Sequence, residues 1–272
     1  MHKHAIRHLV TACALALTAS ASYAAPVSSW DFDIGLRWDT TSGATVFGSG
    51  NGSQTVNGSL ISWGATGGNH LNSTASSSNA RSALQIGNSP ATGSVATDGS
   101  TALTNTITHY NNALSSSFAT LRSATLIADI LLTPEGNSSM PAMQNVFEIN
   151  FVETTNTAGT CLPNSSTVCD DVFVLAFGAL NYEFEFGGYR YYASIFEASG
   201  NLRALSDEAC QAAGAAIGCT GFMTEEGKAT EAQFGFKVTT EPVVVSQVPE
   251  PGALALLGIG LVGLGAMRRR RA

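Results

Sequence analysis

Apolar and polar residues alternate over long stretches of the chain, which is typical of β-strands with one buried face. The clearest run lies near the start, where Asp31 and Asp33 stand between large apolar residues. Its acidic face fits a solvated surface better than a set of calcium ligands. The run therefore predicts a half-buried strand whose inner face carries Trp30, Phe32, Ile34, Leu36 and Trp38.

The alternation returns several times, and one helix stands apart from it. Asn57-Gly58 predicts a two-residue hairpin turn between residues 53–56 and 59–63. Residues 207–216 predict a helix, with Ser206 as its N-cap. Together these patterns predict an all-β fold: a single antiparallel β-sandwich, with a jelly roll as one arrangement that fits. A further strand is predicted at residues 103–108, with threonines 104, 106 and 108 on one face and Leu103, Asn105 and Ile107 on the other. Residues 171–178 are apolar on both faces and predict a central strand. The remaining strands are predicted at residues 121–134, 145–155, 182–186, 189–197 and 232–238.

Both ends of the chain are typical of export. Residues 1–24 predict a signal peptide with a basic start, an apolar stretch and a cleavage site after Ala24. Residues 252–267 contain only Gly, Ala, Leu, Ile, Val and Met, enough for a helix of roughly 24 Å in a membrane. The chain therefore divides into a signal peptide (1–24), an exported domain (25–240), a linker (241–248) and a C-terminal segment (249–272).

The C-terminal segment has three parts in a fixed order. Pro249, Glu250 and Pro251 precede the apolar helix, and Arg268, Arg269, Arg270 and Arg271 follow it. This order resembles the PEP-CTERM sorting signal of Gram-negative bacteria. The resemblance implies export through the Sec machinery, a precursor anchored in the inner membrane, and processing near the motif by an exosortase. The mature protein is then expected at the cell surface or outside the cell, whereas the alternative is an ordinary C-terminal membrane anchor.

A second motif lies in the exported body. Thr108-His109-Tyr110-Asn111 resembles the pattern that gives the THxN family of PEP-CTERM proteins its name, which implies a β-rich protein without an assigned chemistry. From the residues alone, Thr108, His109 and Asn111 suit either a ligand site for sugar hydroxyls or a cation, or a hydrogen-bonded structural corner. We favour the corner, because no second histidine, cysteine or carboxylate lies within ten residues of His109.

Charge and cysteine content restrict the partners. Without residues 1–24 and 252–272 the chain keeps seven of its 13 Lys and Arg and all 20 Asp and Glu, which gives 7 − 20 = −13 and argues against nucleic acid as a partner. Export also favours disulfides over free thiols. Of the three possible connectivities, short loops favour Cys161–Cys169 and Cys210–Cys219, and a zinc site lacks both a C-x-x-C pair and a nearby histidine.

The sequence favours a protein that is not an enzyme and holds no cofactor or metal. Only His70 and His109 remain after export, and no G-x-S-x-G or H-E-x-x-H occurs. The resemblance to PEP-CTERM proteins implies an association with exopolysaccharide or a biofilm matrix. The alternatives are a carbohydrate-binding module or, less well supported, a glycan-processing enzyme. Aromatic candidates for sugar stacking are Trp38, Trp63, Tyr191 and Tyr192, and carboxylate candidates for hydrolysis are Glu148, Glu153, Glu183 and Glu185.

Overall fold

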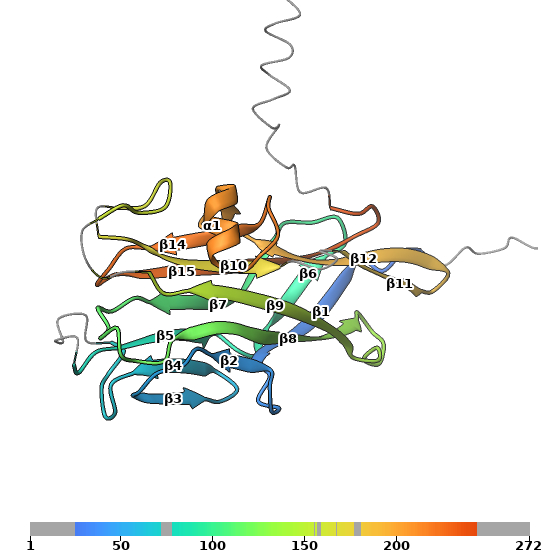
Figure 1. Ribbon diagram of the computed structural model, residues 1–272. Coiled ribbons are helices and arrows are strands. Elements are labelled where there is room, and N and C mark those ends of the chain that lie inside the picture. Colours follow the sequence, from blue (N-terminus) through green and yellow to red (C-terminus); the bar gives the residue numbers. More distant parts are fainter. Residues whose placement is uncertain are drawn as a thin grey trace, which may run out of the picture.

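The computed structural model describes residues 25–71, 78–154, 156, 159–166, 168–176 and 181–243. The expected signal peptide with its cleavage site at Ala24 and the sorting signal from Pro249 to Arg271 lie outside the described residues. Within them, two antiparallel sheets and one short helix form the exported body (Figure 1). None of the described helices is long and apolar enough to cross a membrane.

The first sheet has the order β13-β14-β10-β9-β8-β1-β6, and β2 pairs with β8 beside this path. Its strands are antiparallel neighbours throughout. Their bounds are β1 Ser29–Trp38, β2 Thr45–Phe47, β6 Ala91–Ala96, β8 Leu121–Pro134, β9 Met143–Val152, β10 Asp171–Ala176, β13 Arg203–Ala204 and β14 Thr220–Thr224.

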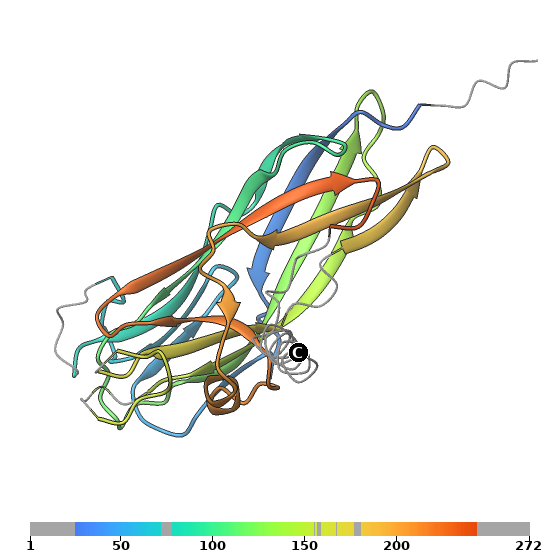
Figure 2. The ribbon, with the colours of Figure 1, turned by 90° about the horizontal axis from the view of Figure 1, so that it is seen from above.

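The second sheet has the order β11-β12-β15-β7-β5-β4-β3 and is also antiparallel. Its inner face and that of the first sheet share one hydrophobic core, and Figure 2 shows the strands of both sheets running along the long axis of the body. Their bounds are β3 Ser53–Val56, β4 Leu60–Gly64, β5 Arg81–Gly87, β7 Ala102–Tyr110, β11 Asn181–Phe186, β12 Tyr189–Glu197 and β15 Ala229–Thr239.

The alternation seen in the sequence explains the central strands of the first sheet. In β1 and β8 every second side chain is buried, as predicted, because the pleat sends these residues into the shared core while their neighbours face outward. The buried series are Trp30, Phe32, Ile34, Leu36 and Trp38 in β1, and Ala124, Leu126, Ala128, Ile130 and Leu132 in β8.

Strand β10 is apolar on both faces because each face is covered. Phe173 and Leu175 enter the shared core. Val172 and Val174 pack on the other side against Ala209 and Ala213, from the helix α1 (Asp207–Ala212) and its C-cap. Figure 1 shows α1 lying over β14 and β10. A helix on an outer face thus accounts for an apolar run that lacks alternation.

Three local predictions need correction. The helix ends at Ala212 rather than 216, although Ser206 caps its N-terminus as predicted. The hairpin between β3 and β4 forms, but the amide of Asn57 donates to the carbonyl of Leu60, so the turn lies one residue later than predicted. In β7 a register shift opposite Gln233 and Gly235 reverses the alternation, and Leu103 is exposed while Thr104 is buried.

The structure contains both expected disulfides, Cys161–Cys169 and Cys210–Cys219. Each closes a short loop, with sequence separations of 8 and 9. Cys169 precedes β10 and Cys219 precedes β14, so both bonds brace segments that lead into neighbouring strands of the first sheet.

Candidate functional site

The THxN tetrad ends strand β7, where its side chains alternate between the outer and inner faces of the second sheet. Thr108 faces outward and donates a hydrogen bond to Glu231 at 3.2 Å. Tyr110 is half-buried and meets the ring of His70 edge-on. His109 and Asn111 are fully buried and point toward the first sheet. The tetrad therefore contributes two inward groups to the space between the sheets.

His109 lies among aromatic rings. Trp63 of β4 stacks on its imidazole with an interplanar angle of 13°, and Phe151 of β9 meets it edge-on at a centroid distance of 5.0 Å. Burial lowers the pKa of His109 to about 3, so the imidazole is neutral at physiological pH. Its Nε2 lies 3.9 Å from Oδ2 of Asp171, which is too long for a hydrogen bond.

Asn111 connects the two sheets directly. Its side-chain amide donates to the carbonyl of Thr224 in β14 at 2.8 Å, and its backbone amide donates to the carbonyl of Lys228 at 2.9 Å. Thr224 is the cross-strand partner of Asp171 in the first sheet. His109 in β7 and Asn111, which directly follows this strand, thus face a cross-strand pair of the opposite sheet. Asn111 is therefore hydrogen-bonded on both sides, whereas neither nitrogen of His109 has a hydrogen-bond partner among the described residues.

Three carboxyl groups gather beside His109, each from a different element. Asp171 begins β10 and is fully buried. Glu153 directly follows β9, and although its side chain is partly exposed, its Oε1 is buried. Glu226, in the turn from β14 to β15, acts electrostatically on both of them. No carboxylate lies within ten residues of His109 in the sequence, but the fold brings three to it from distant positions.

Burial sets the protonation of this cluster. It raises the pKa of Glu153 to about 8 and that of Asp171 well above its usual range, since a charged carboxylate loses its hydration between the sheets. The charge of Glu153 raises the pKa of Asp171 further, whereas a hydrogen bond with Asp171 lowers the pKa of Glu153 in part. Burial also raises the pKa of Glu226. The cluster therefore holds protonated carboxyl groups in a pH range where exposed carboxyls are ionised.

Several oxygen atoms of the cluster are buried without a hydrogen-bond partner among the described residues. They belong to all three carboxyl groups and to the two side chains that face them from the tetrad and β14. Within the same described residues, no three His, Cys, Asp or Glu side chains are arranged to hold a metal ion. The unpartnered atoms are Asp171 Oδ2, Glu153 Oε1, Glu226 Oε1 and Oε2, Asn111 Oδ1 and Thr224 Oγ1.

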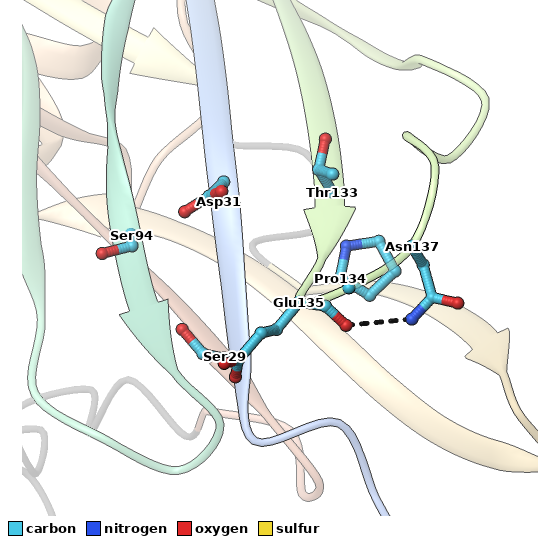
Figure 3. Close-up of a pocket in the computed structure, with 8 residues that line it drawn as sticks. Ser29, Asp31, Ser94, Thr133, Pro134, Glu135 and Asn137 are labelled. Atoms are coloured by element: carbon cyan, nitrogen blue, oxygen red, sulfur yellow. Dashed lines mark hydrogen bonds between the residues drawn. The ribbon is translucent and has the colours of Figure 1, made fainter.

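A polar groove lies near the other end of the strands, beside the start of β1. It has a volume of about 340 Å³, and Figure 3 shows Ser94, Asp31 and Thr133 side by side on β6, β1 and β8. Hydroxyl, amide and carboxylate groups of this kind bind sugar hydroxyls. Its full lining is Ser29, Asp31, Ser94, Thr133, Pro134, Glu135, Gly136 and Asn137.

The prediction that four aromatic residues could stack on sugar rings is wrong for three of them. Trp38, Trp63 and Tyr191 are at most 1% exposed, because each lies on the inner face of its strand, and they offer no surface to a sugar ring. Tyr192 is half-buried. Among the carboxylate candidates, Glu153 enters the buried cluster, while Glu148, Glu183 and Glu185 are exposed.

The comparisons with known proteins concern the C-terminus. The family model described as the PEP-CTERM protein-sorting motif matches residues 247–271, a span that contains the Pro-Glu-Pro motif and all four terminal arginines. The match supports an exported PEP-CTERM protein, processed by an exosortase and carrying a C-terminal membrane-anchoring region. No curated protein matches the chain.

Proposed function

We propose that this chain is a THxN-family protein of the cell surface or extracellular matrix, associated with exopolysaccharide and without enzymatic activity. The observation that carries the proposal is the sorting motif at residues 247–271, because it directs the two-sheet body to the outside of the cell. We assign that body to the β-sandwich class, since its two antiparallel sheets share one core.

The placement of the tetrad supports a non-enzymatic role. A catalytic group has to reach its substrate, whereas His109, Asn111 and Asp171 are each fully buried between the sheets. Asn111 uses its amide to join β7 to β14. The tetrad then serves the packing of the two sheets, and the surface of the domain is left for binding.

The polar groove is our second candidate, as a carbohydrate-binding site. Its volume of about 340 Å³ lies at the lower end of the roughly 300–1,000 Å³ typical of ligand pockets. Asp31, Ser94 and Thr133 present hydrogen-bonding groups from three neighbouring strands, and sugar hydroxyls match such groups.

Sorting is tested by the intact mass of the protein released from cells. Processing near Pro249 predicts a mature form without residues 252–272. A released form that still contains Arg268 to Arg271 would contradict exosortase processing.

Carbohydrate binding is tested by a pull-down on exopolysaccharide purified from the host. The variant Asp31→Ala/Asn137→Ala removes two polar groups of the groove, and we expect it to bind less than the wild type. Asp33→Ala is the matched control, because Asp33 lies on the same exposed face of β1 but does not line the groove. Equal retention of all three proteins would exclude the groove as the binding site.

A further inference from the structure

The carboxyl groups beside His109 lie where charge is poorly tolerated. Trp63, Phe151 and Phe222 surround the imidazole, and Asp171 beside it is fully buried. An isolated carboxylate in such surroundings is costly unless a cation or a proton neutralises it.

The neighbouring side chains supply little positive charge. The pKa of His109 is lowered to about 3 by burial, so the imidazole is neutral. Arg122 acts on Glu153, but its effect is the smallest among those that set the pKa of this carboxyl. Glu226 is a third acid and adds to the repulsion. Because the neighbouring side chains supply so little positive charge, protons are left to neutralise the carboxylates of Glu153 and Asp171.

The hydrogen bonds show where a proton fits. Asp171 Oδ1 accepts from the amide of Thr154 at 2.8 Å, and Glu153 Oε2 accepts from the indole of Trp63 at 2.9 Å. Each carboxyl then has one buried oxygen without a described partner, Asp171 Oδ2 and Glu153 Oε1. The two side chains lie within hydrogen-bonding reach of each other. A single proton between them supplies the partner that both free oxygens lack.

We propose that Glu153 and Asp171 share one proton and that this proton is an alkaline-sensitive latch between the two sheets. Glu153 follows β9, while its indole donor belongs to β4 of the opposite sheet. Loss of the shared proton leaves two adjacent buried negative charges at this contact. The sheets then loosen at the end that carries His109, and an exported protein meets such pH changes directly.

The direction of the pH effect follows from the pKa values. The pKa of Glu153 is about 8 in the fold and 4.5 for an unperturbed side chain, so the folded state binds more protons between these values. The stability from this group is complete below pH 4.5 and is lost as the pH rises through about 8. The lowered pKa of His109 acts in the opposite direction, between about 3 and 6.5. Above pH 6.5 the opposing effect of His109 fades, whereas the raised pKa of Glu226 acts in the same direction as that of the pair, so variants of the pair itself are needed to separate its contribution.

The first test is urea unfolding of the full chain, purified in detergent, from pH 6.5 to 8. We expect the unfolding equilibrium constant of the wild type to rise by up to about tenfold per pH unit. Glu153→Gln and Asp171→Asn keep an acceptor for Trp63 and Thr154 but do not ionise, so both should flatten this dependence. Glu148→Gln is the control, because it changes an exposed carboxylate of the neighbouring strand β9 and should keep the wild-type slope. Equal slopes for all four proteins would overturn the proposal.

The second test observes the proton and the latch without relying on the stability of a variant. At pH 7 the infrared spectrum of the wild type should contain the C=O band of a protonated carboxyl, which disappears above pH 8.5 and is missing in Glu153→Gln/Asp171→Asn. At pH 8.5 the amides of residues 220–231 should exchange faster in the wild type than in Glu153→Gln. Absence of the band at pH 7, or equal exchange, would contradict the latch. So would a rise in melting temperature on adding Ca²⁺ or Zn²⁺ that Asp171→Asn abolishes, because the cluster then holds a cation.

Discussion

The two ends of the exported domain bury aromatic rings between the same two sheets, but only at one end are the buried polar atoms all hydrogen-bonded. At the Trp30 end the ring of Trp30 meets Tyr191 at 5.0 Å and Phe184 at 5.4 Å. Its indole donates to the hydroxyl of Thr97, and the hydroxyl of Tyr191 accepts from the amide of Val27. At the His109 end, both nitrogens of His109 and one oxygen of Asp171 have no partner among the described residues.

This difference indicates that only the Trp30 end is optimised for stability. Aromatic rings whose polar atoms are paired contribute packing without an electrostatic penalty. The unpaired polar groups at the His109 end lower stability, since apolar residues of the same volume would fill that space more favourably. We infer that the Trp30 end is built for stability and that the His109 end is built to respond to protons.

The largest expected effect is at the Trp30 end. Trp30→Ala removes a fully buried indole and should lower the free energy of unfolding by about 3–5 kcal/mol. No buried acidic side chain lies among the described rings around Trp30, so we expect the same loss of unfolding free energy at pH 6 and at pH 8. Denaturant unfolding at both pH values measures it. A loss that doubles between them would remove the contrast between the two ends.

The disulfides provide the next effect. Each closes a loop of around ten residues, for which chain entropy gives about 2.5–3 kcal/mol. Cys161→Ser/Cys169→Ser should lower the free energy of unfolding by that amount and leave the slope between pH 6.5 and 8 unchanged, because the bond lies outside the carboxyl pair. Non-reduced peptide mapping of the wild type provides the control. Free thiols, or a bond from Cys161 to Cys219, would refute the pairing on which this prediction rests.

A smaller effect distinguishes the inner from the outer face of the tetrad. Asn111→Ala leaves the carbonyl of Thr224 without its donor between the sheets and should cost about 1–3 kcal/mol. Thr108→Val is the matched variant on the outer face, where its bond to Glu231 is exposed, and should change stability by less than about 0.5 kcal/mol. Melting temperatures of both variants test this order. A larger loss for Thr108→Val would mean that the outer face carries the structural role.

Local patterns predicted much of the fold. The alternation in β1 and β8 identified their buried series because the shared core lies against one face of each strand. Ser206 was identified as a helix cap from its residue type and position. The bulge in β7 was missed, since the extra residue that exposes Leu103 depends on the register with β15. The helix was predicted too long, because Ala213 already adopts the C-cap conformation.

The buried cluster was beyond the reach of local patterns. Glu153 was recognised as one carboxylate among several, and Asp171 as the start of an apolar strand. The pairing of β10 with β9 and β14 brings these acids to His109, and the packing of the two sheets removes them from water. The spacing of residues along the chain reveals neither the strand pairing nor the packing of the sheets. The signal that remained in the sequence was an acidic residue at the edge of a strand that is otherwise apolar on both faces.

A direct titration of His109 by NMR tests whether the histidine of the tetrad is a neutral side chain enclosed between the sheets. The spectra of the chain without residues 1–24, with labelled histidine, follow His70 and His109 together, and His109→Gln assigns the signals. We predict that His109 stays neutral throughout the range above pH 4, because burial lowers its pKa to about 3. A His109 signal that titrates near pH 6.5, the pKa of an exposed histidine, would contradict the buried cluster and the latch built on it.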